Sequence, residues 1–313
     1  MMDWSTPHQR FFLRQITQRT LLYTEMVTAN ALIHGDAEKL LDHSPEEYPL
    51  ALQLGGNEPE ALAKACQIAK QFNWYEINLN LGCPSDRVQS GAFGASMMAD
   101  PVRVHECLAA MADSGAPVGA KIRIGIDEQD PDQTLLPFVE KIAGLPLKTL
   151  TIHARKAILK GLSPKQNREI PPLDYSQAIK VKAAFPHLNC VLNGGLVDVE
   201  QDHRWLDSLD GVMYGRHAYH SPWAMAKADP IYFDQPAPHS TPDQAVRACY
   251  PYLENKLSQG MYLGHFTRHI LGLYQGVPGA KQFRRTLSEQ ANKAGSGIHT
   301  IETALSHVMQ DPL

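Results

Sequence analysis

Polar side chains close six successive apolar segments of the chain, and these positions are where its chemistry is predicted. They are Gln53 in ALQLGG, Asn78, Asn80 and Cys83 in INLNLGCP, Lys121 and Arg123 in GAKIRIG, His153 in LTIHARK, Asn193 in VLNGG, and Gly215 and Arg216 in MYGRHA. Any one of them could be an ordinary polar residue at the end of a strand. A series of this kind predicts a shared site, because barrel active sites lie at the carboxyl ends of the strands.

Two glycine-containing turns predict an anion site. Gly194 and Gly195 directly follow Asn193, and Gly215 precedes Arg216 one strand and helix later. Glycine lets backbone N–H groups approach an anion closely, and a guanidinium adds two parallel donors. The loops after the last two strands of a barrel commonly bind phosphate in this way.

A phosphate at these turns, with Gln53, Lys121 and His153 beneath it, suggests FMN lying across the mouth of a barrel. A glutamine amide can pair with the edge of the flavin pyrimidine ring. A lysine can stabilise negative charge near N1 and O2 of the reduced ring. The protein would then supply binding, orientation and electrostatics, while the ring supplies the redox chemistry.

The elements that must position these residues alternate between strands and helices. Short runs rich in β-branched and aromatic residues predict strands at 21–27, 49–55, 74–81, 119–125, 149–154, 189–193 and 211–214, with amphipathic helices such as 58–72, 101–113 and 176–185 between them. Without a Gly-x-Gly-x-x-Gly turn, this alternation favours an α/β fold of the (β/α)8 TIM-barrel type over a dinucleotide-binding fold. Because a barrel needs eight strands, the first is expected to be truncated or missing at MMDWSTPHQRFF.

A change of composition after Trp223 predicts a second, smaller unit. The stretch DPIYFDQPAPHSTPDQ is rich in proline and polar residues, and the residues beyond it show helical periodicity at 245–257, 264–273, 279–290 and 297–308. The predicted organisation is a catalytic barrel at 1–228, a linker at 229–244 and an all-helical domain at 245–313.

Composition limits the classes of protein that the chain can be. With 313 residues, 43% hydrophobic and 20% charged, it predicts a globular protein, and without a long apolar run or a basic leader we expect it in the cytoplasm and not in a membrane. Five widely spaced cysteines without a CxxC pair predict reduced thiols, with neither a disulfide framework nor a metal site. The net charge of −4 argues against a general nucleic-acid coat, yet residues 151–180 hold six Lys or Arg against two acidic residues.

Taken together, these motifs resemble the tRNA-dihydrouridine synthases. The matching segments are MMDW, LLYTEMV, LQLGG, EINLNLGCPSDRVQSGAFGASMM, GAKIRIGID, TIHARKAILKGLSPKQNREIPPLDY, VLNGG and YGRHAYHSPW, which cover nearly the whole chain together with RHILGLYQGVPGAKQFRR. The long HARKAILKGLSPKQNREIPPL segment is most similar to the dihydrouridine synthase A subgroup.

The resemblance implies a reaction and the residues that perform it. NADPH would reduce FMN, the flavin would deliver hydride to C6 of a uridine in tRNA, and Cys83 would protonate C5 as a neutral thiol. FMN would be held by Met1, Met2, Gln53, Lys121, His153, Asn193, Gly194, Gly195, Gly215 and Arg216, and Asn80 would face the uridine. The subgroup implies D-loop positions 20 and 20a as the targets.

Two sets of basic and polar residues are predicted to contact tRNA, whose target base must leave its stack to reach a barrel mouth. They are Arg155, Lys156, Lys160, Asn167 and Arg168 after the fifth predicted strand, and Lys281, Gln282, Arg284 and Arg285 in the helical domain. For the second set, an ordinary solvated helix face is a serious alternative.

Two other functions stay open from the sequence. An FMN barrel acting on a small pyrimidine would account for the flavin residues, but it leaves the basic loop and the helical domain without a task. A tRNA-binding or chaperone module with impaired catalysis would explain those two features instead. We expect a monomer.

Overall fold

A parallel sheet of seven strands organises the molecule, a computed structural model that describes residues 1–308. The strands are β1 (Leu22–Thr28), β2 (Leu50–Gly55), β3 (Glu76–Leu81), β4 (Val118–Arg123), β5 (Leu150–His153), β6 (Cys190–Asn193) and β7 (Gly211–Met213). They lie in chain order, and each pairs in parallel with the next. All seven predicted strands are therefore confirmed, to within two residues at either end.

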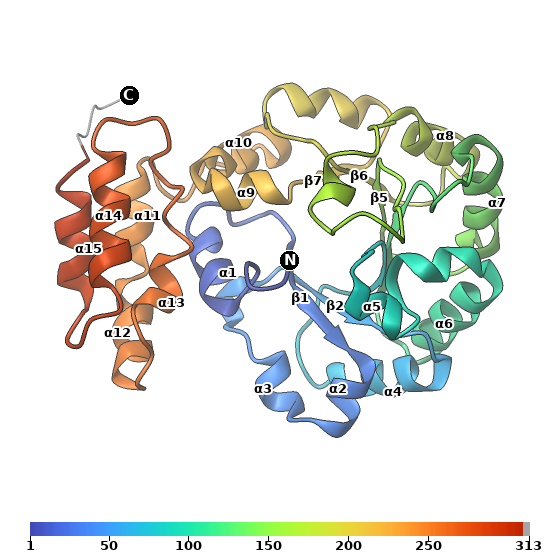
Figure 1. Cartoon of the computed structure of the whole chain (residues 1–313), viewed down its shortest axis with the longest axis horizontal. Helices are drawn as coiled ribbons and strands as arrows, with labels where there is room; N and C mark the ends of the chain where they lie inside the picture. The colour runs from blue at the N-terminus through green and yellow to red at the C-terminus, as the bar shows by residue number, and fades with distance from the viewer. Residues whose placement is uncertain (309–313) are drawn as a thin grey trace.

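The barrel is incomplete within the described residues. There β1 and β7 are the two edges of the sheet and do not pair with each other, and residues 1–5 form turns. One face of β2 and β3 is apolar and fully buried, as Leu52, Leu54, Ile77 and Leu79 show, whereas the other face of β3 carries Glu76, Asn78 and Asn80. Figure 1 shows the helices wrapped around the outside of these strands.

The helices of the barrel follow its strands, and all but α9 and α10, which come after β7, lie between one strand and the next. They are α2 (Ala29–His34), α3 (Ala37–Leu41), α4 (Pro59–Ala69), α5 (Asp86–Ser90), α6 (Pro101–Asp113), α7 (Pro131–Ala143), α8 (Ser176–Ala184), α9 (Arg216–His220) and α10 (Ala228–Phe233). Local sequence sets where they begin: Asp100 and Asp130 cap the first turns of α6 and α7, and each cap is followed by a proline. The helix predicted at 101–113 is confirmed residue for residue.

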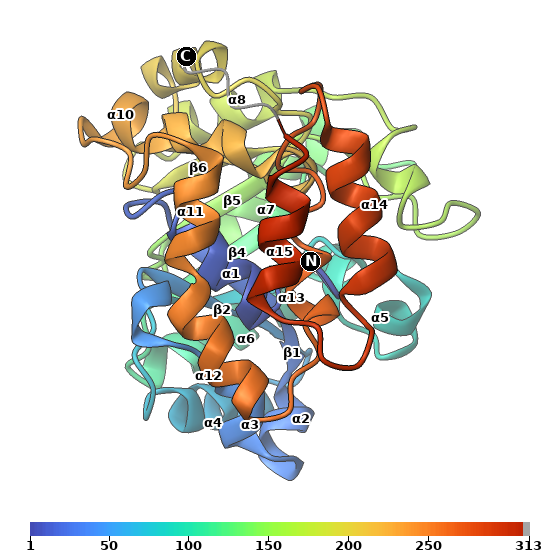
Figure 2. The same ribbon diagram turned by 90° about the vertical axis from the view of Figure 1, so that its left-hand side faces the viewer.

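A group of five helices stands beside the barrel. It comprises α11 (Pro242–Ala248), α12 (Tyr250–Ser258), α13 (Gly264–Thr267), α14 (Ala280–Gln290) and α15 (Ile298–Leu305), which Figures 1 and 2 show gathered on one side, next to α1 (Pro7–Arg14). Phe11 of α1 stacks on Tyr252 of α12 with ring centroids 3.9 Å apart. The predicted helical region is present, and α1 joins it to the barrel.

Three predictions in this region need correction. The helix predicted at 245–257 is interrupted at Cys249, because Pro251 lacks an N–H group and cannot continue α11. The helix predicted at 264–273 ends at Thr267 and continues as turns. The 229–244 segment contains part of α10, and Asp229 is buried against Thr17, so it is not wholly a linker. The domain boundaries themselves stay a prediction.

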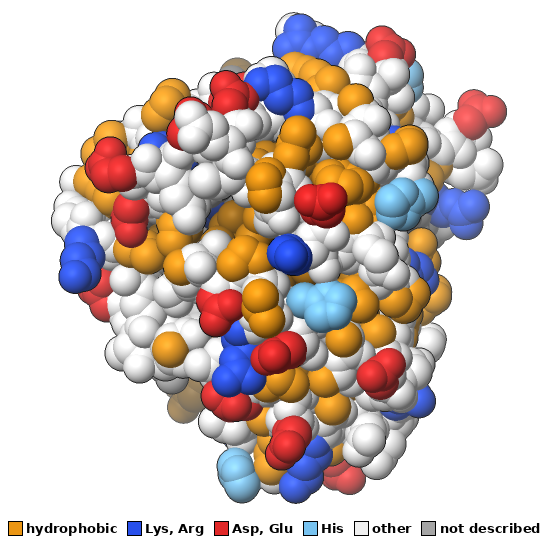
Figure 3. Space-filling model, turned by 90° about the vertical axis from the view of Figure 1, so that its right-hand side faces the viewer, with side chains coloured by type: hydrophobic (Ala, Val, Ile, Leu, Met, Phe, Trp, Pro, Cys, Tyr) orange, Lys and Arg blue, Asp and Glu red, His pale blue; other side chains and the backbone are white. Residues whose placement is uncertain are grey.

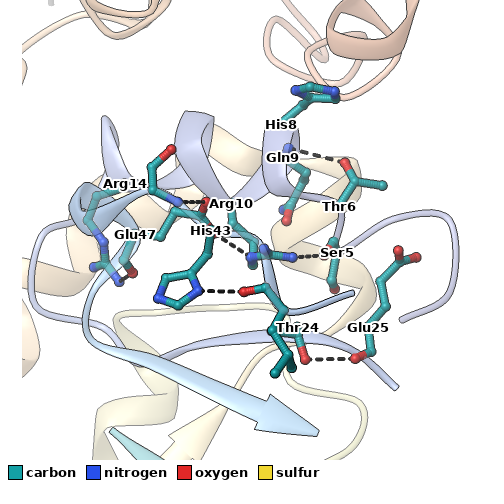
Figure 4. Close-up of polar contacts among 12 residues, drawn as sticks. Ser5, Thr6, His8, Gln9, Arg10, Arg14, Thr24, Glu25, His43 and Glu47 are labelled. Atoms are coloured by element: carbon teal, nitrogen blue, oxygen red, sulfur yellow. Dashed lines mark hydrogen bonds and ion pairs between the residues drawn. The ribbon is translucent and has the colours of Figure 1, made fainter. Parts of the chain in front are cut away.

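Buried charge fixes α1 against the start of the sheet. Arg10 and Arg14 are only 4% and 5% exposed, and both turn toward Glu47, as Figure 4 shows. Arg10 forms an ion pair with the Glu47 carboxylate, while Arg14 donates to the Glu47 and Pro49 carbonyl oxygens. These contacts anchor α1 and thereby residues 1–5. Met1 lies near the end of β7, because a Cβ added at Gly215 would be 3.8 Å from Met1 Sδ.

Candidate active site

Strand register brings the predicted site residues together at the carboxyl ends of the strands. Asn80 is opposite Lys121, and His153 is opposite both Arg123 and Asn193. Gln53, from β2, lies within reach of this row, because Asn80 Nδ2 donates to Gln53 Oε1 over 2.8 Å. These side chains come from five strands and form one polar group at the barrel mouth.

Cys83 lies on a turn that neighbouring side chains hold in place. Asn80 Oδ1 accepts hydrogen bonds from the backbone N–H groups of Gly82 and Cys83 at 3.1 and 2.9 Å. Arg123 Nε donates to the Gly82 carbonyl oxygen over 3.1 Å. Cys83 is partly exposed, whereas the other four cysteines are fully buried. Its thiol is therefore the one cysteine thiol that a substrate at the barrel mouth can reach.

Lys121 contributes a cation whose charge is costly to bury. Its ammonium donates to Asn193 Oδ1 over 3.0 Å, and Asn193 Nδ2 in turn donates to the Met213 carbonyl oxygen. Burial, followed by repulsion from Arg123, lowers the pKa of Lys121 to about 7. An anionic or electron-rich group beside it would favour the charged form.

The turn after β6 needs glycine. Gly194 has φ of 108°, and a Cβ there would lie 2.9 Å from Cδ2 of the His153 ring. Tyr175 donates to the Gly194 carbonyl oxygen over 2.9 Å, which fixes the turn from the far side. A substituted residue would therefore push the ring and strain the backbone at once.

His153 is buried as a neutral ring. Burial, then repulsion from Arg123 and Lys121, holds its pKa well below the usual range. Its Nδ1 is buried and has no hydrogen-bond partner among residues 1–308. Buried polar atoms usually have a partner in the protein, in water or in a ligand, so this nitrogen is available to a bound molecule.

The charges around the site favour an anion. Lys121, Arg123, Arg155, Arg168 and Arg216 are close enough for their charges to lower the pKa values of their neighbours. One carboxylate among them, that of Glu169, pairs with Arg216 at 2.9 Å. This surplus of cations, the Gly194 turn and the unpaired His153 nitrogen all fit a flavin with a phosphate group.

Two basic side chains of the loop after β5 donate hydrogen bonds to backbone carbonyl oxygens. Lys156 Nζ donates to the carbonyl oxygens of Asp127 and Gln129, and Arg155 donates to those of Glu169 and Pro171. Lys160 is exposed and Arg168 partly so. Of this set, Lys160 has the most exposed side chain.

Asn167 does not fit the predicted role in binding RNA. It is fully buried, and its side-chain amide bonds to both the N–H and the carbonyl of Ile158 and to the carbonyl of Leu162. Since none of its polar atoms faces outward, we correct its role to one of shaping the loop. Its spacing within the basic segment gave no sign of this burial.

Lys281, Gln282, Arg284 and Arg285 are all exposed on α14, in the helical group beside the barrel rather than among the strand ends (Figure 1). Arg285 pairs with Glu289 one turn later. By contrast, Figure 3 shows acidic and basic side chains interspersed on the side where α6, α7 and α8 lie. Pairs such as Lys180 with Asp132 balance the charge of that face.

Two positioning contacts were missed from the sequence. Gln89 donates its amide to the carbonyl oxygens of Pro84 and Leu159 and so ties the Cys83 turn to the basic loop. Tyr175 holds the Gly194 turn. Neither residue ends a strand, so the pattern that found the other site residues could not find these.

Residues 1–308 contain no group of three or more His, Cys, Asp or Glu side chains that could hold a metal ion. No helix in the same residues is long and apolar enough to cross a membrane.

Comparison with known proteins identifies the family. The model of the family described as dihydrouridine synthase (Dus) matches residues 1–309. The chain belongs to the dihydrouridine synthase family. It is 51% identical over 310 residues to the tRNA-dihydrouridine(20/20a) synthase of Escherichia coli strain K12, covering 98% of this chain and 90% of that protein. The enzyme of the same name from Vibrio parahaemolyticus is 50% identical over 313 residues, covering 99% and 96%.

Solved structures agree with the fold of this dihydrouridine synthase. The crystal structure of TcOYE with pHBA matches with a TM-score of 0.55 and 10% identity, over 86% of this chain and 88% of that one. The old yellow enzyme homologue from Zymomonas mobilis matches with a TM-score of 0.52 and 11% identity, over 77% and 87%. These matches support the barrel architecture.

Proposed function

We propose that this dihydrouridine synthase uses FMN and NADPH to reduce the C5=C6 bond of uridines 20 and 20a in tRNA. The observation that carries the proposal is the partly exposed Cys83 thiol, held on its turn by Asn80 beside a row of cations. The names of the Escherichia coli and Vibrio relatives, at 51% and 50% identity, support the choice of substrate and positions.

In this proposal the residues of the barrel mouth divide the binding of FMN. Gly194, Gly195, Gly215 and Arg216 would hold the phosphate, together with His153 and Asn193. Gln53 and Lys121 would bind the pyrimidine part of the ring, and Met1 and Met2 would contact the ring. When bound and reduced, FMN supplies the hydride for C6 of the uracil.

Cys83 supplies the other hydrogen. A thiol that carries its proton can act as a general acid. Asn80 orients the Gly82 and Cys83 backbone through two hydrogen bonds. It lies opposite Lys121 on the next strand, where we propose that it contacts the uracil. The thiol then gives its proton to C5 and regains one from solvent.

Recognition of tRNA falls to the surface around the mouth. A uridine of the D-loop must be turned out of its stack to reach Cys83. Lys160 and Arg168 on the basic loop, and Lys281, Arg284 and Arg285 on α14, are placed to contact phosphates. We also propose the cytoplasm as the location of this activity, because its substrate is tRNA.

Flavin absorbance provides a direct test. Purified protein loaded with FMN should lose its flavin absorbance with NADPH and recover it when unmodified tRNA is added without oxygen. Uridine monophosphate at the same concentration of uridine is the matched control, and it should restore little. Equal recovery with the nucleotide would instead favour an enzyme of small pyrimidines. A protein that binds tRNA but no flavin would favour a binding module.

A further inference from the structure

A chain of hydrogen bonds runs through the inside of the barrel from Glu76, at the start of β3, to the Cys83 turn. In order, Asn78 Nδ2 donates to Glu76 Oε1 (2.8 Å), Gln53 Nε2 to Asn78 Oδ1 (3.4 Å), Asn80 Nδ2 to Gln53 Oε1 (2.8 Å), and the Gly82 and Cys83 N–H groups to Asn80 Oδ1 (3.1 and 2.9 Å). It joins the opposite end of the barrel to the proposed acid.

The two ends of this chain set its direction. A side-chain amide can present either its oxygen or its nitrogen, so Asn78, Gln53 and Asn80 could each be reversed. At the upper end, backbone N–H groups can only donate, so Asn80 must turn its oxygen toward Cys83. At the lower end, burial raises the pKa of the Glu76 carboxyl, and its Oε1 accepts from both Asn78 Nδ2 and the Tyr23 hydroxyl, so Asn78 turns its nitrogen toward Glu76.

Burial and two further hydrogen bonds hold Glu76 in place at the lower end of this hydrogen-bond chain. It is fully buried, and its carboxylate also accepts hydrogen bonds from Thr149 Oγ1 at 2.6 Å and from the Tyr23 hydroxyl at 3.2 Å. The space around it is filled, because a Cβ added at Gly119 would lie 2.4 Å from the carboxyl group. A buried carboxyl without an ion-pair partner among residues 1–308 is costly, and packing alone gives no reason for it.

We propose that Glu76 is a positioning residue for the proposed reaction, and in this respect the inference rests on the proposed function of Cys83. Through Asn78 and Gln53 it fixes the Asn80 amide with its oxygen toward the Cys83 turn. Without the Glu76 Oε1 acceptor at the lower end, Asn78 is free to reverse, and the Asn80 contact with the turn weakens.

Alkylation of Cys83 measures the turn directly. Cys83 is the single partly exposed cysteine of five, so the early reaction of cofactor-free protein with iodoacetamide reports on it alone. Glu76→Leu removes the acceptor, and Asn78→Leu cuts the chain while leaving Glu76 its other two donors. Both should speed alkylation by about 3- to 10-fold, the value of one hydrogen bond. If Glu76→Leu does not fold, Asn78→Leu carries the test.

Two matched variants separate positioning from loss of packing. Glu76→Gln keeps one oxygen toward Asn78 and turns its NH2 to the Thr149 hydroxyl, which can accept, so it should restore the wild-type alkylation rate. Thr149→Val removes a hydrogen bond to Glu76 outside the chain and should leave the rate unchanged. Equal acceleration in Thr149→Val and Asn78→Leu, or none in either leucine variant, would overturn the proposal.

The same variants give a second readout in turnover. Under the proposal, Asn78→Leu lowers kcat for dihydrouridine formation while KM for tRNA is unchanged. Because alkylation needs neither FMN nor tRNA, a protein that forms no dihydrouridine would contradict the proposed function and leave the alkylation result to decide the role of Glu76.

Discussion

The ammonium group of Lys121 lies among other cations, and among residues 1–308 it has no carboxylate partner. Burial and the charge of Arg123 lower its pKa from 10.5 to about 7. Between these two pH values the unfolded chain binds more protons than the folded protein, so the stability of the wild type rises with pH. Below about pH 7 the folded protein carries the full cost of the buried charge.

Replacing Lys121 should therefore stabilise the cofactor-free protein in a pH-dependent manner. We expect Lys121→Met to raise the free energy of unfolding at pH 6, by an amount that shrinks steadily as the pH approaches 9. Urea unfolding at pH 6, 7.5 and 9 measures this, with Lys39→Met on the exposed surface of α3 as the control. A gain that is the same at every pH would show that the charge of Lys121 is not the cause.

The role of Cys83 in proton transfer should be separable from the binding of FMN and tRNA. Cys83→Ala is expected to keep FMN and tRNA affinity and to lower the single-turnover rate of dihydrouridine formation by about 100-fold or more, the usual contribution of a general acid. Mass spectrometry of digested tRNA gives the rate. Ser85→Ala is the matched control, because its Oγ lies 3.4 Å from Cys83 Sγ, and it should remain active. A fast Cys83→Ala enzyme would remove the thiol from the mechanism.

The turn after β6 offers a test that separates backbone strain at Gly194 from the contact of its side chain with the His153 ring. Gly194 and Gly260 both have positive φ, of 108° and 90°, but a Cβ would meet the His153 ring only at Gly194 and open space at Gly260. Gly194→Ala and Gly260→Ala should each lose about 1 kcal/mol of stability through strain. Only Gly194→Ala should also release FMN, measured by fluorescence of free flavin. Equal retention of FMN in both variants would contradict the proposed phosphate site.

The strands were predictable because they are short and rich in Leu, Ile and Val, as β2 and β6 illustrate. The break between α11 and α12 was also predictable, because Pro251 cannot continue α11. The hydrophobic periodicity is the same on both sides of the break, so it predicted a single helix. What the sequence could not supply was burial within loops. Asn167 reads as a polar loop residue, and only the folded loop shows that its amide is enclosed.

The same limit applies to the site as a whole. Strand ends pointed to Gln53, Asn80, Cys83 and Lys121, because register alone brings such residues together. The rule that site residues end their strands could not predict Glu76, because Glu76 begins its strand and is linked to the site only through other side chains. Roles in FMN and tRNA binding stay predictions, which the variants above address.

The helical group beside the barrel gives the molecule a second basic surface, although its net charge is −4. We expect Lys281→Glu with Arg284→Glu to weaken tRNA binding and to reduce the slope of log affinity against log salt by about 0.7 to 0.9 for each lost phosphate contact. FMN content should not change.

The control for this pair is Lys39→Glu with Lys64→Glu, which makes the same change of charge at exposed positions on α3 and α4. Filter binding at several salt concentrations compares the two. If both pairs weaken tRNA binding equally, general repulsion and not α14 is responsible.

The most direct test of the whole account is the position of dihydrouridine in tRNA after reaction with the purified protein. Unmodified tRNA, FMN and NADPH are incubated with the enzyme, and dihydrouridine is mapped along the chain by mass spectrometry. The account predicts dihydrouridine at positions 20 and 20a and none when NADPH is omitted. Uridine left intact at both positions, in tRNA that the flavin-loaded protein binds, would contradict it.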